Sequence, residues 1–192
     1  MRELRIAVLV SGSGSNLQSI IDAVENHTLT SQIVSVISNK EDAFGLERAK
    51  THHIPAYFIN PKEEGYDEKL LARLQEDQVD LVVLAGYLKI VDANLIKAYR
   101  GRIINIHPSL LPKFGGKGYY GIRVHEAVLA AGESESGATV HFVDEGVDTG
   151  KAILQKTVPV YETDTPQLLQ QRVLHEVEHK ILVEAIKKLE EA

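Results

Sequence analysis

Short apolar runs rich in β-branched residues alternate with longer amphipathic segments over the first half of the chain. We expect parallel strands over 4–10, 33–38, 56–59, 81–84 and 103–106. Between them, apolar residues recur at helical spacing, as at positions 17, 20, 21 and 24, which is typical of crossover helices that cover a sheet. This alternation predicts an α/β fold whose largely parallel, twisted sheet carries helices on both faces.

The pattern changes after residue 107. We expect a helix over 122–131, strands over 138–143 and 152–158, and a closing helix over 166–189 that begins with Thr165 as N-cap and Pro166 in the first turn. The chain has 192 residues, 44% of them hydrophobic, which suffices for one well-buried core but not for two. We therefore predict a single domain over residues 1–192.

Composition narrows the classes of partner. The formal net charge of −6 disfavours a nucleic-acid partner, because duplex binding needs clustered basic residues. The longest apolar runs fall far short of the roughly 18 residues that a membrane span needs, and no signal peptide is recognisable. The absence of cysteine fits a reducing compartment. We expect a cytoplasmic location and no membrane partner, and leave an oligomer open.

Two polar residues end the last of the parallel runs. Asn105 and His107 are two positions apart, so on a strand both side chains project from one face. An amide donor beside an imidazole suits acyl transfer, in which an oxyanion develops on a carbonyl. Asp144 is the candidate carboxylate partner of the imidazole, whereas Asp148 before Thr149-Gly150 is typical of a turn. Taken singly, Asn105 and His107 are better explained by structural hydrogen bonds. Paired on one strand face at the carboxyl edge of a parallel sheet, they favour catalysis.

A glycine- and serine-rich loop follows the first strand. Gly14, Ser15 and Asn16 open the first helix, where free backbone N–H groups and the helix dipole favour an anion such as phosphate. Leu17 stands where a dinucleotide fingerprint has its third glycine, and no P-loop lysine follows. The alternative is an ordinary strand-to-helix turn capped by serine.

The residues His175-Glu176-Val177-Glu178-His179 match the H-E-x-x-H pattern of zinc hydrolases. Downstream of this motif, only Glu184, Glu190 and Glu191 are available as a further ligand, and we expect the last two to fray. We therefore favour a chance match and predict no metal, with a zinc hydrolase as the alternative function.

Four segments in order resemble the folate-dependent formyltransferases. They are Ser11-Gly12-Ser13-Gly14-Ser15-Asn16-Leu17-Gln18, Leu84-Ala85-Gly86-Tyr87, Asn105-Ile106-His107-Pro108-Ser109-Leu110-Leu111-Pro112 and Asp144-Glu145-Gly146-Val147-Asp148-Thr149-Gly150. The resemblance implies a Rossmann-like formyltransferase fold. It also implies transfer of the formyl group of 10-formyltetrahydrofolate to the amine of 5-phosphoribosylglycinamide in purine biosynthesis. A non-catalytic folate-binding module is a further alternative.

The resemblance also implies roles for individual residues. Asn105 and His107 would polarise the formyl carbonyl, with Asn105 also touching the folate, and Asp144 would accept a proton from the amine. Gly14, Ser15 and Asn16 would hold the substrate phosphate, and Glu178 would contact the ribose hydroxyls. The backbone of four residues would line the pterin pocket: Leu88, Lys89, Ile90 and Val91.

Two further expectations concern Lys89 and the segment 114–121. The family usually has arginine where Lys89 stands, which puts a side-chain role for Lys89 in doubt. The segment 114–121 is rich in glycine and is expected to be a mobile loop over the site, with a long surface excursion as the alternative. Related transfer-RNA formyltransferases and formyltetrahydrofolate hydrolases are expected to carry an additional domain, which favours the purine enzyme.

Overall fold

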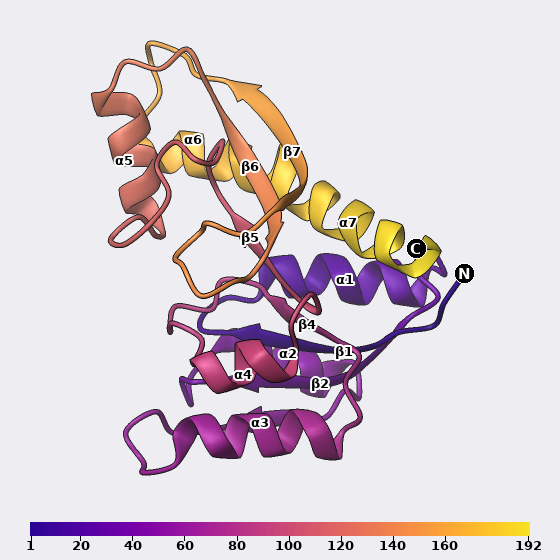
Figure 1. Cartoon of the computed structure of the whole chain (residues 1–192). Coiled ribbons are helices and arrows are strands. Elements are labelled where there is room, and N and C mark those ends of the chain that lie inside the picture. The colour runs from indigo at the N-terminus through magenta and orange to yellow at the C-terminus, as the bar shows by residue number, and fades with distance from the viewer.

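One seven-stranded sheet runs through the computed structural model, which describes residues 1–192 (Figure 1). Its strands are β1 (Arg5–Val10), β2 (Gln32–Ser38), β3 (Ala56–Phe58), β4 (Leu81–Leu84), β5 (Ile103–His107), β6 (Glu135–Phe142) and β7 (Ala152–Pro159). Their order across the sheet is β3-β2-β1-β4-β5-β6-β7. Strands β1 to β5 pair in parallel, whereas β6 and β7 join antiparallel. The prediction of a largely parallel α/β sheet is confirmed.

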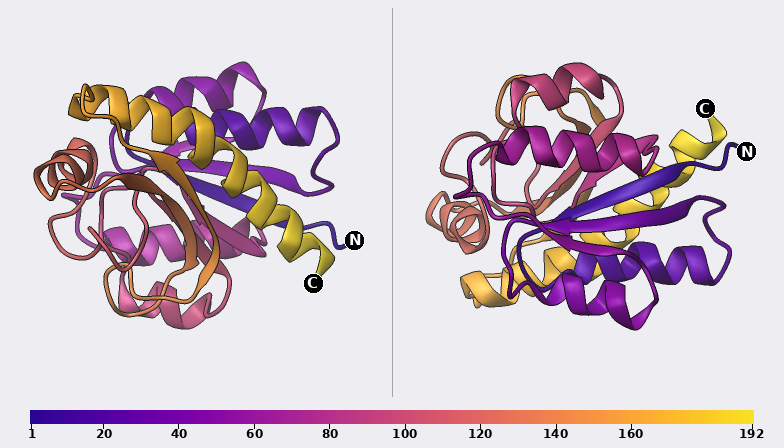
Figure 2. Two further views of the ribbon diagram at one scale, coloured as in Figure 1. Left: turned by 90° about the horizontal axis from the view of Figure 1, so that it is seen from above. Right: turned by 90° about the horizontal axis from the view of Figure 1, so that it is seen from below.

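Helices cover both faces of the sheet (Figure 2). They are α1 (Ser15–Glu25), α2 (Phe44–Thr51), α3 (Tyr66–Glu76), α4 (Ala93–Ala98), α5 (Ile122–Ala130), α6 (Pro166–Val173) and α7 (His179–Glu191). The larger apolar core lies under α1, α2, α6 and α7, and the smaller core lies under α3 and α4. None of these helices combines the length and apolar composition needed to cross a membrane.

Strand β1 shows why the central parallel strands are almost entirely apolar. Ile6 and Val8 pack into the larger core, while Ala7 and Leu9 between them pack into the smaller one. Both faces of the strand are therefore out of water, so alternation of apolar and polar residues gives way to a continuous apolar run. Polar side chains gather where β1 and β5 end, at Ser11, Asn105 and His107, which places the chemistry at that edge.

The closing helix is longer than predicted and is not regular. Thr165 caps it as expected, its side chain accepting a hydrogen bond from the backbone N–H of Leu168, with Pro166 in the first turn. A five-residue π-helical turn, Leu174–Glu178, then separates α6 from α7. The extra residue in this turn rotates the following helix by about 100° relative to a regular α-helix. The apolar stripes of both halves therefore face the same core.

The end of α7 is anchored rather than frayed, so the expectation for Glu190 is wrong. Glu190 is 1% exposed, and its Oε1 accepts hydrogen bonds from the backbone N–H groups of Thr30 and Ser31 at 3.0 and 2.8 Å. The backbone N–H of Arg2 also donates to the carbonyl of Glu190 at 2.6 Å. The two termini consequently lie side by side (Figure 1).

We expect Glu190→Ala to lower the free energy of unfolding by about 1–3 kcal/mol, because it leaves buried backbone donors without a partner. Urea denaturation followed by circular dichroism measures the change. The exposed neighbour provides a matched control: Glu191→Ala should change stability by less than about 0.5 kcal/mol. Equal effects of the two substitutions would contradict an anchoring role for Glu190.

Candidate active site

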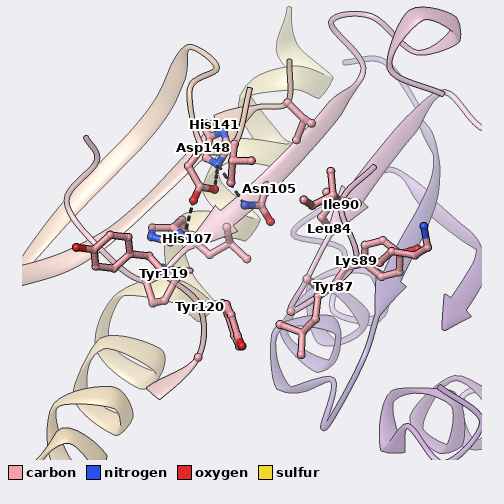
Figure 3. A pocket seen from close by; sticks show the side chains of 18 of the residues that line it. Leu84, Tyr87, Lys89, Ile90, Asn105, His107, Tyr119, Tyr120, His141 and Asp148 are labelled. Carbon is pink, nitrogen blue, oxygen red and sulfur yellow. Dashed lines mark hydrogen bonds and ion pairs between the residues drawn. The ribbon is translucent and has the colours of Figure 1, made fainter. Parts of the chain in front are cut away.

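A cavity of about 640 Å³ lies at the carboxyl ends of β1, β4 and β5, where open α/β sheets place ligands. Residues of the β4–α4 loop form one wall and residues of the β5–α5 loop form the opposite wall (Figure 3). The loop between β1 and α1 closes one end, and the loop between β6 and β7 contributes a further side. Segments far apart in the sequence thus share one cleft.

Asn105 and His107 both open into this cavity from β5. Ile104 and Ile106, which alternate with these two residues, pack into the larger core. Because side chains alternate along a strand, Asn105 and His107 share the face that points away from that core. His107 is only 4% exposed. The structure therefore brings the predicted amide and imidazole together on one strand face (Figure 3).

The carboxylate beside His107 belongs to Asp148. Its Oδ2 lies 3.5 Å from Nδ1 of His107 and accepts a hydrogen bond from the backbone N–H of Gly116 at 3.0 Å. Its Oδ1 lies 3.6 Å from Nε2 of His141. Burial raises the pKa of Asp148, but the adjacent imidazoles of His141 and His107 and the hydrogen bond from the Gly116 N–H outweigh burial and hold that pKa below its ordinary value. Asp148 is thus a carboxylate at neutral pH.

The predicted approach of Asp144 to the imidazole is wrong. Asp144 lines the same cavity, but its Oδ1 accepts hydrogen bonds from the backbone N–H of Gly146 at 3.0 Å and from Oγ1 of Thr149 at 2.5 Å. The bond to the residue two positions on is an Asx turn. The turn role expected of Asp148 therefore falls to Asp144, because both aspartates stand before a glycine two positions later and only the folded loop distinguishes them.

Close backbone packing fixes the loop that carries Asp148. A Cβ atom at Gly150 would lie 1.7 Å from the carbonyl oxygen of Phe142, so no other residue fits there without moving the chain. Asp148 itself has a left-handed φ of 58°, which aspartate tolerates better than most residues. The loop thus turns back on β6 and aims Asp148 at the histidines.

His141 orients Asn105 and was not singled out by sequence reasoning. Its Nδ1 lies 2.8 Å from the carbonyl of Phe142, which can only accept, so Nδ1 carries the proton. Its Nε2 is then free to accept from Nδ2 of Asn105 at 3.2 Å. This contact uses one of the two amide hydrogens and leaves the other for a ligand. Alternation along β6 was the available signal, since His141 pairs with Asn105 across the sheet.

The neighbouring chain also sets the tautomer of His107. Its Nε2 lies 2.8 Å from the carbonyl of Phe114, so Nε2 carries the proton and Nδ1 faces Asp148. Burial lowers the pKa of His107, and the nearby Asp148 carboxylate opposes this effect only in part. The resting imidazole is therefore neutral at neutral pH, with an acceptor nitrogen beside a carboxylate.

A third buried histidine lines the cavity, and it makes no hydrogen bond. His125, on α5, has 0% exposure, and neither of its ring nitrogens has a hydrogen-bond partner. Burial lowers its pKa to about 4, with a smaller effect from His107. His125 is therefore neutral over the physiological range.

The loop before α1 has the geometry of an anion site. Gly14 is the N-cap residue, with a left-handed φ of 71°, and no side chain caps this helix. The first backbone bond of α1 runs from Gln18 N–H to the Gly14 carbonyl, so the N–H groups of Ser15, Asn16 and Leu17 make no bond within the chain. The serine cap of the alternative interpretation is absent, and two of the residues with free donors, Ser15 and Asn16, line the cavity.

Glu178 reaches the cavity beside this loop from the π-helical turn. Its Oε1 accepts a hydrogen bond from Nδ2 of Asn16 at 3.2 Å, and it is 7% exposed. Oδ1 of Asn16 is buried without a partner. Burial raises the pKa of Glu178 to about 7, although the bond from Asn16 opposes the shift. A π-helical turn frequently marks a functional site, and here it directs Glu178 at the loop.

The raised pKa of Glu178 predicts a pH dependence of stability. In the unfolded chain this group ionises near 4.5, whereas in the folded protein it keeps its proton up to about 7. The folded state binds more protons between these values, so its stability falls as pH rises from 4.5 through 7. The free energy of unfolding should fall by roughly 3 kcal/mol over this range, at about 1.4 kcal/mol per pKa unit.

Glu178→Gln should remove this loss, so urea denaturation at pH 5 and pH 8 should give a smaller difference for the variant than for the wild type. Asn16 still has an acceptor in the variant, which makes the substitution nearly isosteric. Parallel pH profiles for the two proteins would show that Glu178 ionises as freely in the folded state as in the unfolded chain.

The predicted folate segment, residues 88–91, borders the other end of the cavity. Leu88 is 54% and Ile90 71% exposed, which is unusual for side chains of this type. The backbone N–H of Leu88 is taken by Oγ of Ser11 at 2.9 Å, whereas residues 89–91 make no backbone hydrogen bond within the chain. Free main-chain groups between exposed apolar side chains suit a flat heterocycle.

The Lys89 side chain turns away from the centre of the cavity. Its Nζ lies 3.6 Å from Oδ1 of Asp67 and 4.7 Å from the centre of the Tyr66 ring. These contacts account for the ammonium group without a ligand. The expected role of residue 89 in folate binding is that of its backbone, which stays a prediction.

The segment 114–121 forms the wall opposite the folate segment (Figure 3). Two bonds tie it to the centre of the site: the Phe114 carbonyl accepts from His107, and the Gly116 N–H donates to Asp148. Tyr119 and Tyr120 are 38% and 47% exposed on this wall. Whether the loop moves stays a prediction, but its conformation is coupled to both catalytic candidates.

The H-E-x-x-H motif has no ligand set around it. The rings of His175 and His179 lie edge to face, 5.2 Å between centres, and Nε2 of His175 lies 2.9 Å from Oε1 of Gln171. No group of three or more histidine, aspartate or glutamate side chains in the structure is arranged to hold a metal ion. The π-helical turn places Glu178 toward Asn16 instead, so the zinc-hydrolase interpretation gains no support.

Comparison with known proteins agrees with this geometry. A family described as formyl transferase matches residues 4–186. The chain is 45% identical to the chloroplastic phosphoribosylglycinamide formyltransferase of Arabidopsis thaliana over 96% of its own length and 65% of that protein. It is 43% identical to phosphoribosylglycinamide formyltransferase of Haemophilus influenzae over 95% of its own length and 85% of that protein.

Among solved structures, glycinamide ribonucleotide transformylase 1 from Symbiobacterium toebii superposes with a TM-score of 0.92 at 44% identity. The match covers 98% of this chain and 88% of that one. The chain spans less than two thirds of the length of two relatives named as chloroplastic: 65% of the protein from Arabidopsis thaliana and 62% of the protein from Vigna unguiculata.

Proposed function

The chain belongs to the formyl transferase family, and we propose that it transfers the formyl group of 10-formyltetrahydrofolate to the amine of 5-phosphoribosylglycinamide. The observation that carries the proposal is the cluster of Asn105, His107 and Asp148 at the middle of one cavity. A loop of free N–H donors lies at one end of that cavity, and exposed apolar residues lie at the other. A phosphorylated amine and a folate would thus meet at the cluster.

The two substrates occupy opposite ends of the cavity in this proposal. The phosphate binds the N–H groups of Gly14, Ser15 and Asn16, and Glu178 accepts hydrogen bonds from the ribose hydroxyls. The pterin of the folate binds main-chain groups of residues 88–91, and the formyl group lies against Asn105. The support is the pattern of free donors and exposed apolar side chains described above.

The reaction joins the amine nitrogen to the formyl carbon. Attack of the amine converts the carbonyl oxygen into an oxyanion, which the free hydrogen of the Asn105 amide stabilises. Asp148 removes a proton from the amine, directly or through water, and shares it with Nδ1 of His107, 3.5 Å away. The resulting imidazolium also stabilises the oxyanion.

Collapse of the tetrahedral intermediate breaks the bond between the formyl carbon and N10 of the folate. The proton held between Asp148 and His107 passes to that nitrogen, which leaves as the amine of tetrahydrofolate. The amine of the acceptor has then lost one proton and gained the formyl group, so the site returns to its starting state. The lowered pKa of His107 favours this release.

An assay of formyl transfer with both substrates tests the proposal. We expect one equivalent of formylated ribonucleotide for each equivalent of tetrahydrofolate, and no release of tetrahydrofolate when the ribonucleotide is omitted. Folate binding without turnover would favour a non-catalytic module. Turnover that needs a stoichiometric metal and is lost with a chelator would favour a metal-dependent hydrolase.

Several expectations lie beyond these observations and stay predictions: a cytoplasmic location, no metal, no nucleic-acid partner, and a single domain over residues 1–192. The plant relatives are named as chloroplastic, so the location of a tagged chain in cells is the relevant measurement. Size-exclusion chromatography with light scattering measures the oligomeric state.

A further inference from the structure

Helix α2 packs directly against the loop that we assign to the phosphate. The backbone N–H of Gly45 donates to the carbonyl of Gly12 at 3.0 Å. A Cβ atom on Gly14 would lie 2.7 Å from Cα of Gly45, and one on Gly45 would lie 2.8 Å from Cγ2 of Val10. The two glycines therefore let the first turn of α2 contact the loop backbone. Helix α2 thus supports the loop.

Arg48 lies one turn further along α2 and bonds to the same loop. Its Nε donates to the carbonyl of Ser13 at 2.7 Å, and its Nη1 donates to Oε1 of Gln18 at 3.2 Å. The guanidinium carbon lies 4.8 Å from the centre of the Phe44 ring. The planar group thus links the loop to α1 and is held by a ring of its own helix.

The bond to Ser13 determines where the next N–H group points. The peptide between Ser13 and Gly14 is trans, since Leu111-Pro112 is the cis peptide of the chain. In a trans peptide the carbonyl and the following N–H point in opposite directions. Arg48 holds the Ser13 carbonyl and does not itself line the cavity, whereas Gly14 does. The N–H of Gly14 is therefore directed away from Arg48.

Positive charge near this loop is otherwise scarce. The lysines that line the cavity are Lys89 and Lys117, and Lys89 is engaged with Asp67. Lys117 belongs to the loop on the opposite wall. A phosphate at the start of α1 would carry up to two negative charges, which a fixed cation behind the loop stabilises.

We infer that Arg48 is a positioning residue for the substrate phosphate, acting through the Ser13–Gly14 peptide without touching the phosphate. The inference rests on the proposed function, because it takes a phosphorylated amine as the substrate. It predicts that Arg48 matters for the phosphate alone, and not for the ribose, the amine or the folate.

The test compares a phosphorylated substrate with its dephosphorylated form in Arg48→Met, which keeps the apolar stem and removes the donors. We expect KM for 5-phosphoribosylglycinamide to rise about 10-fold or more, the range for lost bonds to charged groups, with kcat within about 3-fold. For the ribonucleoside without phosphate, kcat/KM should be unchanged. Arg48→Lys keeps the positive charge but lacks the planar set of donors, and should give a smaller rise in KM for the phosphorylated substrate.

Arg73→Met is the matched control, because Arg73 on α3 likewise lies over an aromatic ring, that of Tyr57, and is outside the cavity. This substitution should leave KM unchanged for both the phosphorylated and the dephosphorylated substrate. Equal losses for the phosphorylated and dephosphorylated substrates in Arg48→Met would overturn the inference. If Arg48→Met does not fold, as judged by its thermal transition, Arg48→Lys carries the same comparison.

Calorimetry with inorganic phosphate separates this inference from the proposed function. We expect the wild type to bind phosphate more tightly than Arg48→Met by the same factor as the rise in KM. Absence of formyl transfer in the wild type would contradict the proposed function. The difference in phosphate binding between the wild type and Arg48→Met would still support a positioning role for Arg48. Equal phosphate binding by wild type and Arg48→Met would overturn the role of Arg48 whatever the activity.

Discussion

Asp148→Asn should lower kcat by about 10²- to 10⁴-fold, the usual contribution of a general base. Asparagine has the same shape, and its amide oxygen still accepts from the Gly116 N–H, so the loop should keep its conformation. It cannot take a proton from the attacking amine. Steady-state kinetics with both substrates measures the effect, and KM for each should change by less than kcat.

Asp144→Asn is the matched control for Asp148→Asn, because both residues belong to one loop and line one cavity. Its oxygen bonds to Gly146 and Thr149, and an amide oxygen can keep both bonds. We expect kcat within about 3-fold of the wild type, far less than the loss of a general base. If Asp144→Asn lost activity and Asp148→Asn retained it, the assignment of the base would be reversed.

His107→Ala should lower kcat by about 10²- to 10³-fold, as does loss of one group that stabilises an oxyanion. The variant loses the nitrogen that shares the proton with Asp148 and the bond to the Phe114 carbonyl. Added imidazole should restore part of the activity, because the missing ring leaves space between the loop and the strand. Single-turnover kinetics would locate the loss in the chemical step.

A second histidine of the cavity controls for loss of volume. His125 is equally buried but has no hydrogen-bond partner, so His125→Gln should cost less than about 10-fold in kcat, below the loss of a group that acts in the transition state. Loss of activity in His125→Gln as large as in His107→Ala would mean that packing of the cavity, and not the chemistry of His107, explains the effect.

The predicted elements that proved accurate are those with strong local patterns. The central parallel strands β1, β2 and β4 are buried on both faces, and the apolar run of each marks it within one or two residues, as with 81–84 and β4. Thr165 and Pro166 marked the start of α6 because capping is a property of neighbouring residues. The placement of Asn105 and His107 on one face of β5 likewise follows from the two-residue period of a strand.

The π-helical turn lies beyond the reach of such patterns. An apolar period of 3.6 fits the residues on each side of Leu174–Glu178 taken separately, so the sequence predicts one regular helix. The extra residue is tolerated because the core on the sheet holds both halves in phase. Its consequence, the direction of Glu178 toward Asn16, exists only once α7 is packed against α1.

Asp144 and Asp148 show the same limit at the centre of the site. Both are followed by glycine two positions on, and each therefore suits a turn. Contact between Gly150 and the Phe142 carbonyl folds the loop back along β6, which carries Asp148 to His107 and leaves Asp144 to make the turn. His141 enters the site in a similar way, through pairing of β6 with β5.

The order of the residues was enough to establish the parallel sheet, its amide and imidazole, and the free donors before the first helix, because each depends on the geometry of a few consecutive peptides. The choice of the carboxylate, the partner of the amide and the support behind the donor loop came from contacts between residues 35 to 41 positions apart in sequence: His107 with Asp148, Asn105 with His141, and Ser13 with Arg48. Their meeting depends on how the loops pack against one another, and no local period encodes that packing.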